Sequence, residues 1–343
     1  GKTVLGLYLA TKLKLKTLVI VHKEFLMNQW KERIEQFVPD AKVGRIQRKN
    51  IMSDGCDIVI GLLQSISMIE YPEDTFKGFG FVIYDECHHL GAEVFSRALL
   101  KTNTRYTLGL SATPKRQDGL SNVFEWYLGP MVYVVNKRES ETVKVELYHY
   151  HDSNPNYSNL TLNMRGQPNL PIMINKICEF KPRIDLITTL ITKCLAEGRK
   201  ILLLSDRKNH LGLIKDELDR IALLTKSDFT SGYYLGGMKQ CDLEKTEKND
   251  VILGTFSMAS EGFDCREPLD TIILASPKSS IEQAVGRSLR QEAKDRKFVP
   301  LVIDIIDEFA TFPRQALKRV QFYKRNKYSI STFDKNMEEI KNK

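Results

Sequence analysis

The stretch that decides the fold is Phe81-Val82-Ile83-Tyr84-Asp85-Glu86-Cys87-His88-His89. The apolar run at its start is typical of a short buried strand. Two acids at the end of such a strand suit a metal site that faces a bound phosphate. We expect Asp85 to hold Mg²⁺, directly or through water. We expect Glu86 to orient and deprotonate an attacking water molecule.

A second stretch carries the opposite charge and reads Gln283-Ala284-Val285-Gly286-Arg287-Ser288-Leu289-Arg290. If this stretch is helical, Arg287 and Arg290 lie on one face of the helix, because they are three residues apart. Paired arginines stabilise the charge that develops on a transferring phosphoryl group. Because the two stretches lie far apart in the sequence, the hypothesis requires two lobes that close on one nucleotide.

The chain opens with Gly1-Lys2-Thr3, which matches the last part of a phosphate-binding loop at the start of a helix. Lys2 would contact the β and γ phosphates of ATP, and the Thr3 hydroxyl would bind Mg²⁺. The tripeptide alone is a weak signal, and the two acids give it weight. Most of the backbone donors of such a loop precede this tripeptide and are not in the sequence. We therefore expect this chain to bind ATP poorly and to miss the strand that feeds the loop.

The composition predicts a globular protein of two or three domains, with 343 residues, 42% hydrophobic and 27% charged. The net charge of +8 favours a polyanionic partner, although a generally lysine-rich surface explains it equally well. No apolar run approaches the roughly 20 residues of a membrane span, so no membrane partner is expected. The six cysteines form no C-x-x-C pair, which argues against zinc. Their scatter indicates reduced thiols in an intracellular compartment, the cytoplasm or the nucleus.

Apolar runs alternate with helical patterns in both halves, which predicts two lobes, each a mainly parallel sheet flanked by helices. Ligands of open α/β sheets bind just beyond the carboxyl ends of the strands. Polar residues at such places are candidates for contact with a nucleic-acid backbone: His22, Lys23, Gln64, Ser65, Ser205, Thr255 and Ser257. The alternative for the first two is that they cap the next helix.

Two further groups of polar residues follow strands. Ser111 and Thr113 end a strand, and their hydroxyls can bond His88 and relay the state of the phosphate. The alternative for His88 or His89 is an ordinary structural histidine. Gly262 permits close approach of backbone to a ligand. Asp264 is expected either to accept a ribose hydroxyl or to hold an arginine of the later motif.

The expected domains are an N-terminal ATPase lobe at 1–140, a connection and insert at 141–171, a C-terminal lobe at 172–328 and a charged tail at 329–343. Within the C-terminal lobe, the stretch 314–328 is rich in both basic and aromatic residues. It predicts either a helix that faces nucleic acid or an amphipathic helix whose aromatic side chains pack on the lobe.

In their order and spacing, these motifs resemble those of superfamily 2 helicases. The resemblance rests on Gly1-Lys2-Thr3, Asp85-Glu86-Cys87-His88, Ser111-Ala112-Thr113, Thr255 to Asp264, and Gln283 to Arg290, and it covers nearly the whole chain. The details are most similar to the XPB-like branch and to helicases of large DNA viruses. Arg116-Gln117-Asp118 resembles the Arg-Glu-Asp element of that branch, with Gln in place of Glu.

The resemblance implies two RecA-like lobes with ATP and Mg²⁺ between them and nucleic acid across both. It adds Gln283 to the catalytic arginines of the second lobe, and it favours DNA as the polymer and an infected cell as one possible location. An RNA helicase and a non-hydrolysing nucleic-acid-binding module stay open as alternatives. Polarity, strand separation, pathway and oligomeric state also stay open at this point.

Overall fold

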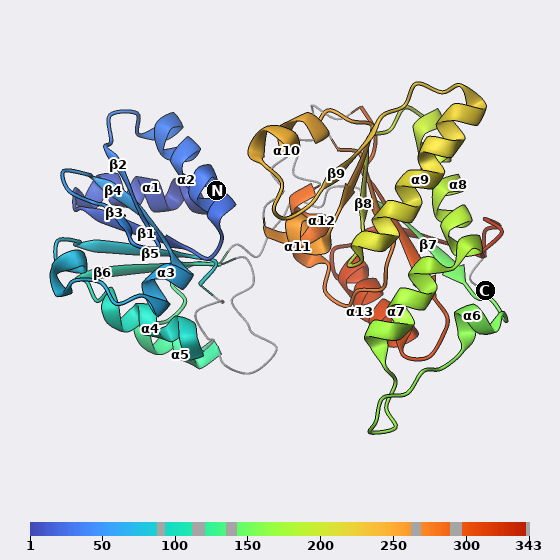
Figure 1. The fold of residues 1–343 in the computed structure, drawn as a ribbon, viewed down its shortest axis with the longest axis horizontal. Helices are drawn as coiled ribbons and strands as arrows, with labels where there is room; N and C mark the ends of the chain where they lie inside the picture. Colours follow the sequence, from blue (N-terminus) through green and yellow to red (C-terminus); the bar gives the residue numbers. More distant parts are fainter. Residues whose placement is uncertain (88–92, 112–120, 135–142, 262–268, 289–296, 341–343) are drawn as a thin grey trace. The chain divides into compact units, whose positions relative to one another are not determined.

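The computed structural model describes residues 1–87, 93–111, 121–134, 143–261, 269–288 and 297–340. The chain divides into two compact units, Gly1–Asn136 and Lys137–Lys343. Each unit is a mainly parallel sheet with helices on both faces, as the alternating pattern predicts (Figure 1). The expected α/β class is therefore confirmed for both halves.

The sheet of the first unit has the order β3-β2-β4-β1-β5-β6, and only the β2–β3 pair is antiparallel. Its strands are β1 (Thr17–Val21), β2 (Val43–Gln47), β3 (Asn50–Met52), β4 (Ile58–Leu62), β5 (Phe81–Asp85) and β6 (Tyr106–Leu110). Its helices are α1 (Lys2–Leu13), α2 (Glu24–Phe37), α3 (Leu63–Met68), the short 3-10 helix η1 (Glu73–Phe76), α4 (Glu93–Lys101) and α5 (Ser121–Leu128).

Strand β5 is buried on both faces, which explains its unbroken apolar run. Val82 and Tyr84 belong to the core shared with α3 and α4. Phe81 and Ile83 belong to the core on the other face, shared with α1 and α2. The acids that follow therefore lie at the carboxyl end of an interior strand that packs on both of its faces.

The sheet of the second unit has the order β13-β7-β12-β11-β8-β10-β9, and all its neighbouring strands are parallel. Its strands are β7 (Lys144–Tyr150), β8 (Ile201–Leu204), β9 (Ser231–Tyr234), β10 (Val251–Gly254), β11 (Thr271–Leu274), β12 (Leu301–Asp307) and β13 (Ser329–Phe333). Its helices are α6 (Pro155–Ser158), α7 (Leu170–Glu179), α8 (Lys181–Ala196), α9 (Lys208–Thr225), α10 (Gln240–Thr246), α11 (Phe256–Glu261), α12 (Glu282–Ser288) and α13 (Phe312–Arg325).

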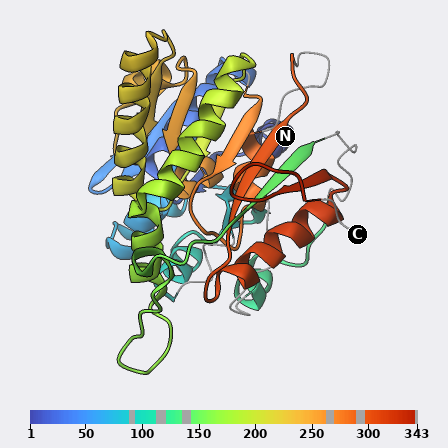
Figure 2. The same ribbon diagram turned by 90° about the vertical axis from the view of Figure 1, so that its right-hand side faces the viewer.

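Two cores lie on the two faces of this sheet. One core packs α7, α8 and α9 against the strands, and the other packs α11, α12 and α13. Figure 2 shows α8 and α13 on opposite sides of these strands. Phe322 and Tyr323 of α13 are buried, so the aromatic residues of the basic stretch pack on the sheet, as one of the two interpretations predicts.

Two strands of this sheet lie outside the range 172–328 that was expected for the C-terminal lobe. Strand β7 lies inside the stretch expected as a connection, and β13 lies inside the stretch expected as a charged tail. The two strands pair with each other, and β7 also pairs with β12. The pattern Ser329-Ile330-Ser331-Thr332-Phe333 is too short to predict a strand from the sequence. In the structure it is an edge strand that is only half-buried.

Two further expectations bear on the environment of the protein. Within the described part of the chain, no helix combines the length and the apolar character needed to cross a membrane. The cysteines in that part are all free thiols: Cys56, Cys87, Cys178, Cys194 and Cys241.

Candidate functional site

The two acids that follow β5 adopt an unusual backbone. Asp85 ends the strand, and Glu86 has a φ of 48°, in the left-handed region that non-glycine residues rarely occupy. Such strain persists only where the surroundings hold it, and it is enriched at functional sites. The Glu86 residue is 3% exposed, so its carboxylate is held inside the protein at the carboxyl end of the sheet.

Lys2 reaches this carboxylate from the first turn of α1. Its Nζ lies 2.9 Å from Glu86 Oε1, and the two side chains are 32% and 4% exposed. The first turn of α1 holds no acidic residue, so its backbone N–H groups and helix dipole favour an anion. The structure therefore brings together the first tripeptide and the acidic stretch, as the sequence predicts.

Asp85 is bonded through both of its oxygens. The Trp30 indole Nε1 donates to Asp85 Oδ2 at 2.9 Å, and the Glu86 backbone N–H donates to Oδ1 at 3.0 Å. Burial raises the pKa of Asp85, and the hydrogen bond from Trp30 acts in the opposite direction. A cation beside this carboxylate would favour the charged form that burial disfavours.

The donor set fits Mg²⁺. This ion usually keeps several waters and takes one or two protein ligands together with substrate phosphates. The Asp85 carboxylate and the half-buried Thr3 hydroxyl are oxygen ligands of that kind. Among the described residues, no group of three or more His, Cys, Asp or Glu side chains forms a metal cage of its own. A site completed by phosphate and water is consistent with that finding.

Strand β6 approaches this site closely. Asp85 pairs in register with Leu110, so Ser111 and Glu86 each follow directly on the end of one of these two paired strands. A Cβ atom on Gly109 would lie 3.1 Å from Cys87 Sγ and 2.7 Å from a Leu128 methyl carbon, which explains the glycine. Burial raises the pKa of the Cys87 thiol to about 12, so this cysteine stays neutral and serves packing. The coupling candidates His88 and Thr113 lie outside the described residues.

The polar candidates after β1 and β4 lie together, because these strands pair in register from Thr17 to Val21. Gln64 Nε2 donates to the His22 carbonyl oxygen at 2.5 Å. Lys23 is the N-cap of α2, but its side chain makes no capping hydrogen bond. Ser65 differs from the expectation: it is buried, and its hydroxyl accepts the Arg48 backbone N–H at 2.9 Å. A small hydroxyl here satisfies a buried backbone donor instead of facing a ligand.

The candidates in the second unit also separate into two groups. Ser205 is fully buried, lies 3.0 Å from His210 Nδ1 and accepts the Arg207 N–H, so it is a turn residue and not a surface contact. The Thr255 hydroxyl accepts the Met258 N–H at 3.4 Å and lies 3.2 Å from Ser257 Oγ, at the start of α11. This capping arrangement leaves Ser257 exposed.

Helix α12 (Glu282–Ser288) confirms that the arginine stretch begins as a helix. It carries the half-buried Gln283 and the backbone of Arg287. Arg290 lies outside the described residues, as do Gly262, Asp264 and the Arg116-Gln117-Asp118 element.

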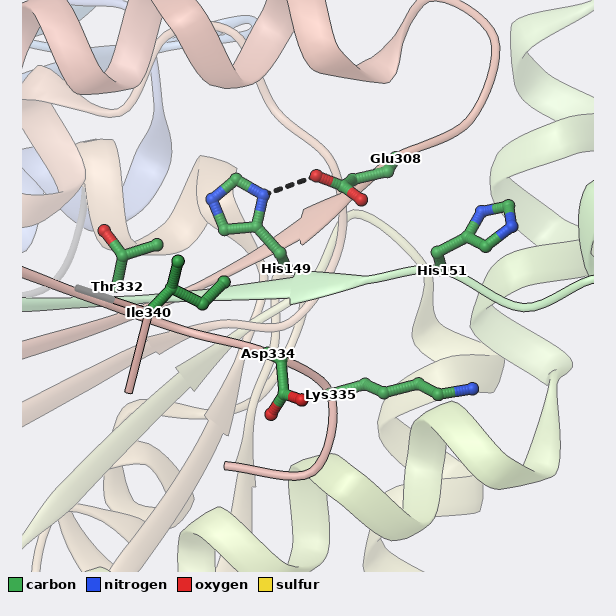
Figure 3. A pocket seen from close by; sticks show the side chains of 7 residues that line it. All are labelled: His149, His151, Glu308, Thr332, Asp334, Lys335 and Ile340. Atoms are coloured by element: carbon green, nitrogen blue, oxygen red, sulfur yellow. Dashed lines mark hydrogen bonds and ion pairs between the residues drawn. The ribbon is translucent and has the colours of Figure 1, made fainter. Parts of the chain in front are cut away.

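A cavity of about 500 Å³ lies elsewhere, at the carboxyl ends of β7, β12 and β13 (Figure 3). His149 Nδ1 lies 2.6 Å from Glu308 Oε1 there. The Asp334 carboxylate accepts the backbone N–H groups of Asn336 and Glu338. The acids that line the cavity are thus already bonded to neighbouring groups. The lining of the cavity includes none of the predicted site residues.

Sequence reasoning missed Trp30 and a set of buried ion pairs in the second unit. Asp304 and Asp307 are fully or almost fully buried in β12, where they pair with Arg319 and Arg183. A signal was present, because two acids within the apolar run Leu301-Val302-Ile303-Asp304-Ile305-Ile306-Asp307 require partners. The sequence did not show which cations those partners were.

Residues 1–116 match the family described as "Type III restriction enzyme, res subunit". The chain is 38% identical over 342 residues to the "Putative ATP-dependent RNA helicase L396" of Acanthamoeba polyphaga mimivirus, covering 97% of this chain and 63% of that protein. It is 28% identical over 343 residues to the "Probable helicase D10" of Escherichia phage T5, covering 97% of this chain and 71% of the phage protein.

A similar fold occurs in a solved fragment of a "putative HsdR subunit of a type I restriction enzyme" from Vibrio vulnificus YJ016. The TM-score is 0.63 at 17% identity, over 95% of this chain and 59% of that one. The chain spans 63% of the length of the mimivirus relative, and the match covers 97% of this chain. Over nearly its whole length, the chain is therefore similar to these viral helicases, and its first 116 residues match a helicase-related family model.

Proposed function

We propose that this chain is the motor of a helicase or translocase that couples ATP hydrolysis to movement along a nucleic acid, with DNA as the polymer. The observation that carries the proposal is the contact between Lys2 and Glu86, which joins a helix N-terminus to a strained acidic strand end. A cation and a carboxylate held in one place are what a triphosphate and its attacking water require.

In the proposed mechanism, the γ phosphate of ATP draws the Lys2 ammonium away from Glu86. Phosphate oxygens carry more charge than a single carboxylate and can accept several donors at once. The released Glu86 carboxylate then accepts a proton from the attacking water. Thr3 and Asp85 would hold Mg²⁺, which supplies charge neutralisation to the phosphates when bound.

The second unit is proposed to contribute Gln283, Arg287 and Arg290. Guanidinium groups supplied to a transferring phosphoryl group increase its rate of transfer by about 10³–10⁵. Gly262 and Asp264 are proposed to contact the nucleotide, and His88, Ser111 and Thr113 to couple hydrolysis to movement. Contacts to nucleic acid are proposed for His22, Lys23, Gln64, Thr255 and Ser257.

DNA is favoured over RNA by the similarity of the motifs to the XPB-like branch. The mimivirus relative carries an RNA helicase name, so RNA is the second candidate polymer. Phosphate contacts position a protein on either polymer without reading its bases. The net charge of +8 suits both.

The test is the ATPase rate of the full-length protein with duplex DNA, single-stranded DNA and RNA. The proposal predicts that DNA stimulates hydrolysis more than RNA does. A larger stimulation by RNA would identify an RNA helicase. Nucleic-acid binding without hydrolysis on any polymer would identify a non-hydrolysing module.

A further inference from the structure

The segment at 275–278 lies between β11 and α12. It leaves the fully buried strand β11 at the centre of the sheet and leads to α12, the helix that carries Gln283 and Arg287. Any shift of this segment is passed to the helix within a few residues. Three groups from other elements bind the segment.

Arg319 of α13 holds one end of the segment. It is 3% exposed, and its Nε and Nη2 atoms donate to Asp304 of β12 at 2.9–3.1 Å. Its Nη1 atom donates to the carbonyl oxygen of Lys278. The Tyr323 hydroxyl donates to Asp304 Oδ2 at 2.9 Å and fixes the carboxylate in turn.

Arg183 of α8 holds the other end from the opposite face of the sheet. It is fully buried, and its Nε and Nη2 atoms donate to Asp307 at 2.7 and 2.9 Å. Its Nη1 atom donates to the Ala275 carbonyl oxygen at 2.8 Å. The two arginines thus bond in the same way. Each pairs with an acid of β12 through Nε and Nη2, and each donates from Nη1 to a carbonyl oxygen of the segment.

The turn after β8 supplies the third contact. The Asp206 backbone N–H donates to Ser276 Oγ at 2.9 Å, and Asp206 Oδ2 pairs with Lys278 Nζ at 2.8 Å. The segment is therefore bonded from α8, α13 and the β8–α9 turn.

Stability alone does not explain two buried Arg–Asp pairs. Taking such charges out of water is costly, and apolar replacements of similar volume are often neutral or stabilising. What apolar residues cannot supply is a directed hydrogen bond to a chosen backbone carbonyl. Arg319 and Arg183 each make that bond, and both bonds end on the segment that places α12.

We propose that Arg319 and Arg183 are positioning residues for hydrolysis, which hold the segment 275–278 and thereby set the place of Gln283 and Arg287. This inference rests on the proposed function of α12. Its expected consequence is a loss of kcat with little change in KM for ATP. A misplacement of about 1 Å in a catalytic group can lower a rate by roughly 100-fold.

The test replaces the Arg319 network by apolar residues in the full-length protein, as the triple variant Arg319→Met, Asp304→Leu and Tyr323→Phe. The melting temperature, the affinity for single-stranded DNA, kcat and KM are measured together. The proposal predicts a kcat about 10–100-fold lower at a nearly unchanged melting temperature, affinity and KM. Arg319→Lys, which keeps the charge but lacks the planar fork, is expected to be intermediate. If the triple variant does not fold, Arg319→Lys decides the question on the same measurements.

The matched control is Arg199→Met. Arg199 pairs with Glu197 at 2.7 Å and donates to the Val299 carbonyl oxygen at 3.1 Å, but it precedes β8 at the other end of the sheet. The proposal is overturned if the Arg319 variants keep the wild-type kcat, or if Arg199→Met loses as much. If the unaltered protein hydrolyses no ATP, the proposed function fails instead. Hydrogen exchange at 275–288 then still tests the positioning role, which predicts faster exchange in the Arg319 variants than in Arg199→Met.

Discussion

Lys2 Nζ and Glu86 Oε1 lie 2.9 Å apart, although 84 residues separate them in the sequence. The lysine begins a helix, and the glutamate follows β5, an interior strand of the same unit. In this pair, the Lys2 ammonium and the Glu86 carboxylate neutralise each other. A nucleotide that binds here must compete with Glu86 for the ammonium group.

Lys2→Ala removes this cation from the helix N-terminus. We expect the affinity for ATP to fall and hydrolysis to be lost, because the β and γ phosphates lose a charged donor. Nucleotide affinity is measured with a fluorescent ATP analogue. Lys12→Ala, at the other end of α1, is the control and should keep wild-type affinity. An unchanged affinity in Lys2→Ala would remove this lysine from phosphate binding.

Trp30→Phe removes the hydrogen bond that the indole donates to Asp85. That bond lowers the pKa of Asp85, so its loss should raise the pKa further above its ordinary value. The carboxylate must be ionised to hold Mg²⁺. The acidic limb of the pH profile of kcat should therefore move to higher pH, and additional Mg²⁺ should partly restore the rate. A profile that does not move would show that Asp85 does not bind the metal.

Arg287→Ala and Arg290→Ala are each expected to lower the ATPase rate by about 10³-fold or more, because the developing phosphoryl charge loses a partner. Binding to single-stranded DNA should persist. The measurements are steady-state phosphate release and a DNA-binding titration on the same preparations. Two variants with wild-type rates would exclude both arginines from catalysis.

Arg183→Ala leaves Asp307 buried without its cation. Breaking a buried pair on one side costs about 3–5 kcal/mol, so the free energy of unfolding of the second unit should fall by that order. Chemical denaturation measures it. Arg220→Ala is the comparison, because Arg220 pairs with Glu217 while its own side chain is 58% exposed. Equal losses in the two variants would contradict the buried pair as a stabilising contact.

His210 makes stability depend on pH. It is fully buried, and burial, assisted by the charge of Arg183, lowers its pKa to about 3. The folded protein keeps this imidazole neutral, whereas the unfolded chain protonates it below its ordinary pKa of about 6.5. Its contribution to stability is therefore complete above pH 6.5 and declines as the pH falls toward 3. Denaturation at pH 7 and pH 4.5 measures how far the free energy of unfolding falls between the two pH values. This fall should be smaller for His210→Gln than for the unaltered protein, and equal falls would refute this assignment.

The sequence predicts well those features that depend on local pattern. The apolar run at 81–83 marks β5, and the polar residues that follow it lie at the carboxyl end of the sheet. The alternation of strands and helices is sufficient for the two parallel sheets, because such sheets need helical crossovers.

The features it does not predict depend on partners distant in the sequence. Arg183 and Asp307 are 124 residues apart, and nothing local pairs them. Ser65 and Ser205 have the right residue type and place for a ligand contact. Each instead satisfies a backbone N–H inside the protein, and only the three-dimensional arrangement distinguishes these two uses.

The most direct measurement is phosphate release by the full-length protein and its Glu86→Gln variant, with ATP, Mg²⁺ and DNA. The substituted amide keeps the shape of the side chain but accepts no proton from water at neutral pH. The account predicts nucleic-acid-stimulated hydrolysis in the unaltered protein, and a variant that still binds ATP but releases no phosphate above background. Hydrolysis by the variant at the wild-type rate would contradict the account.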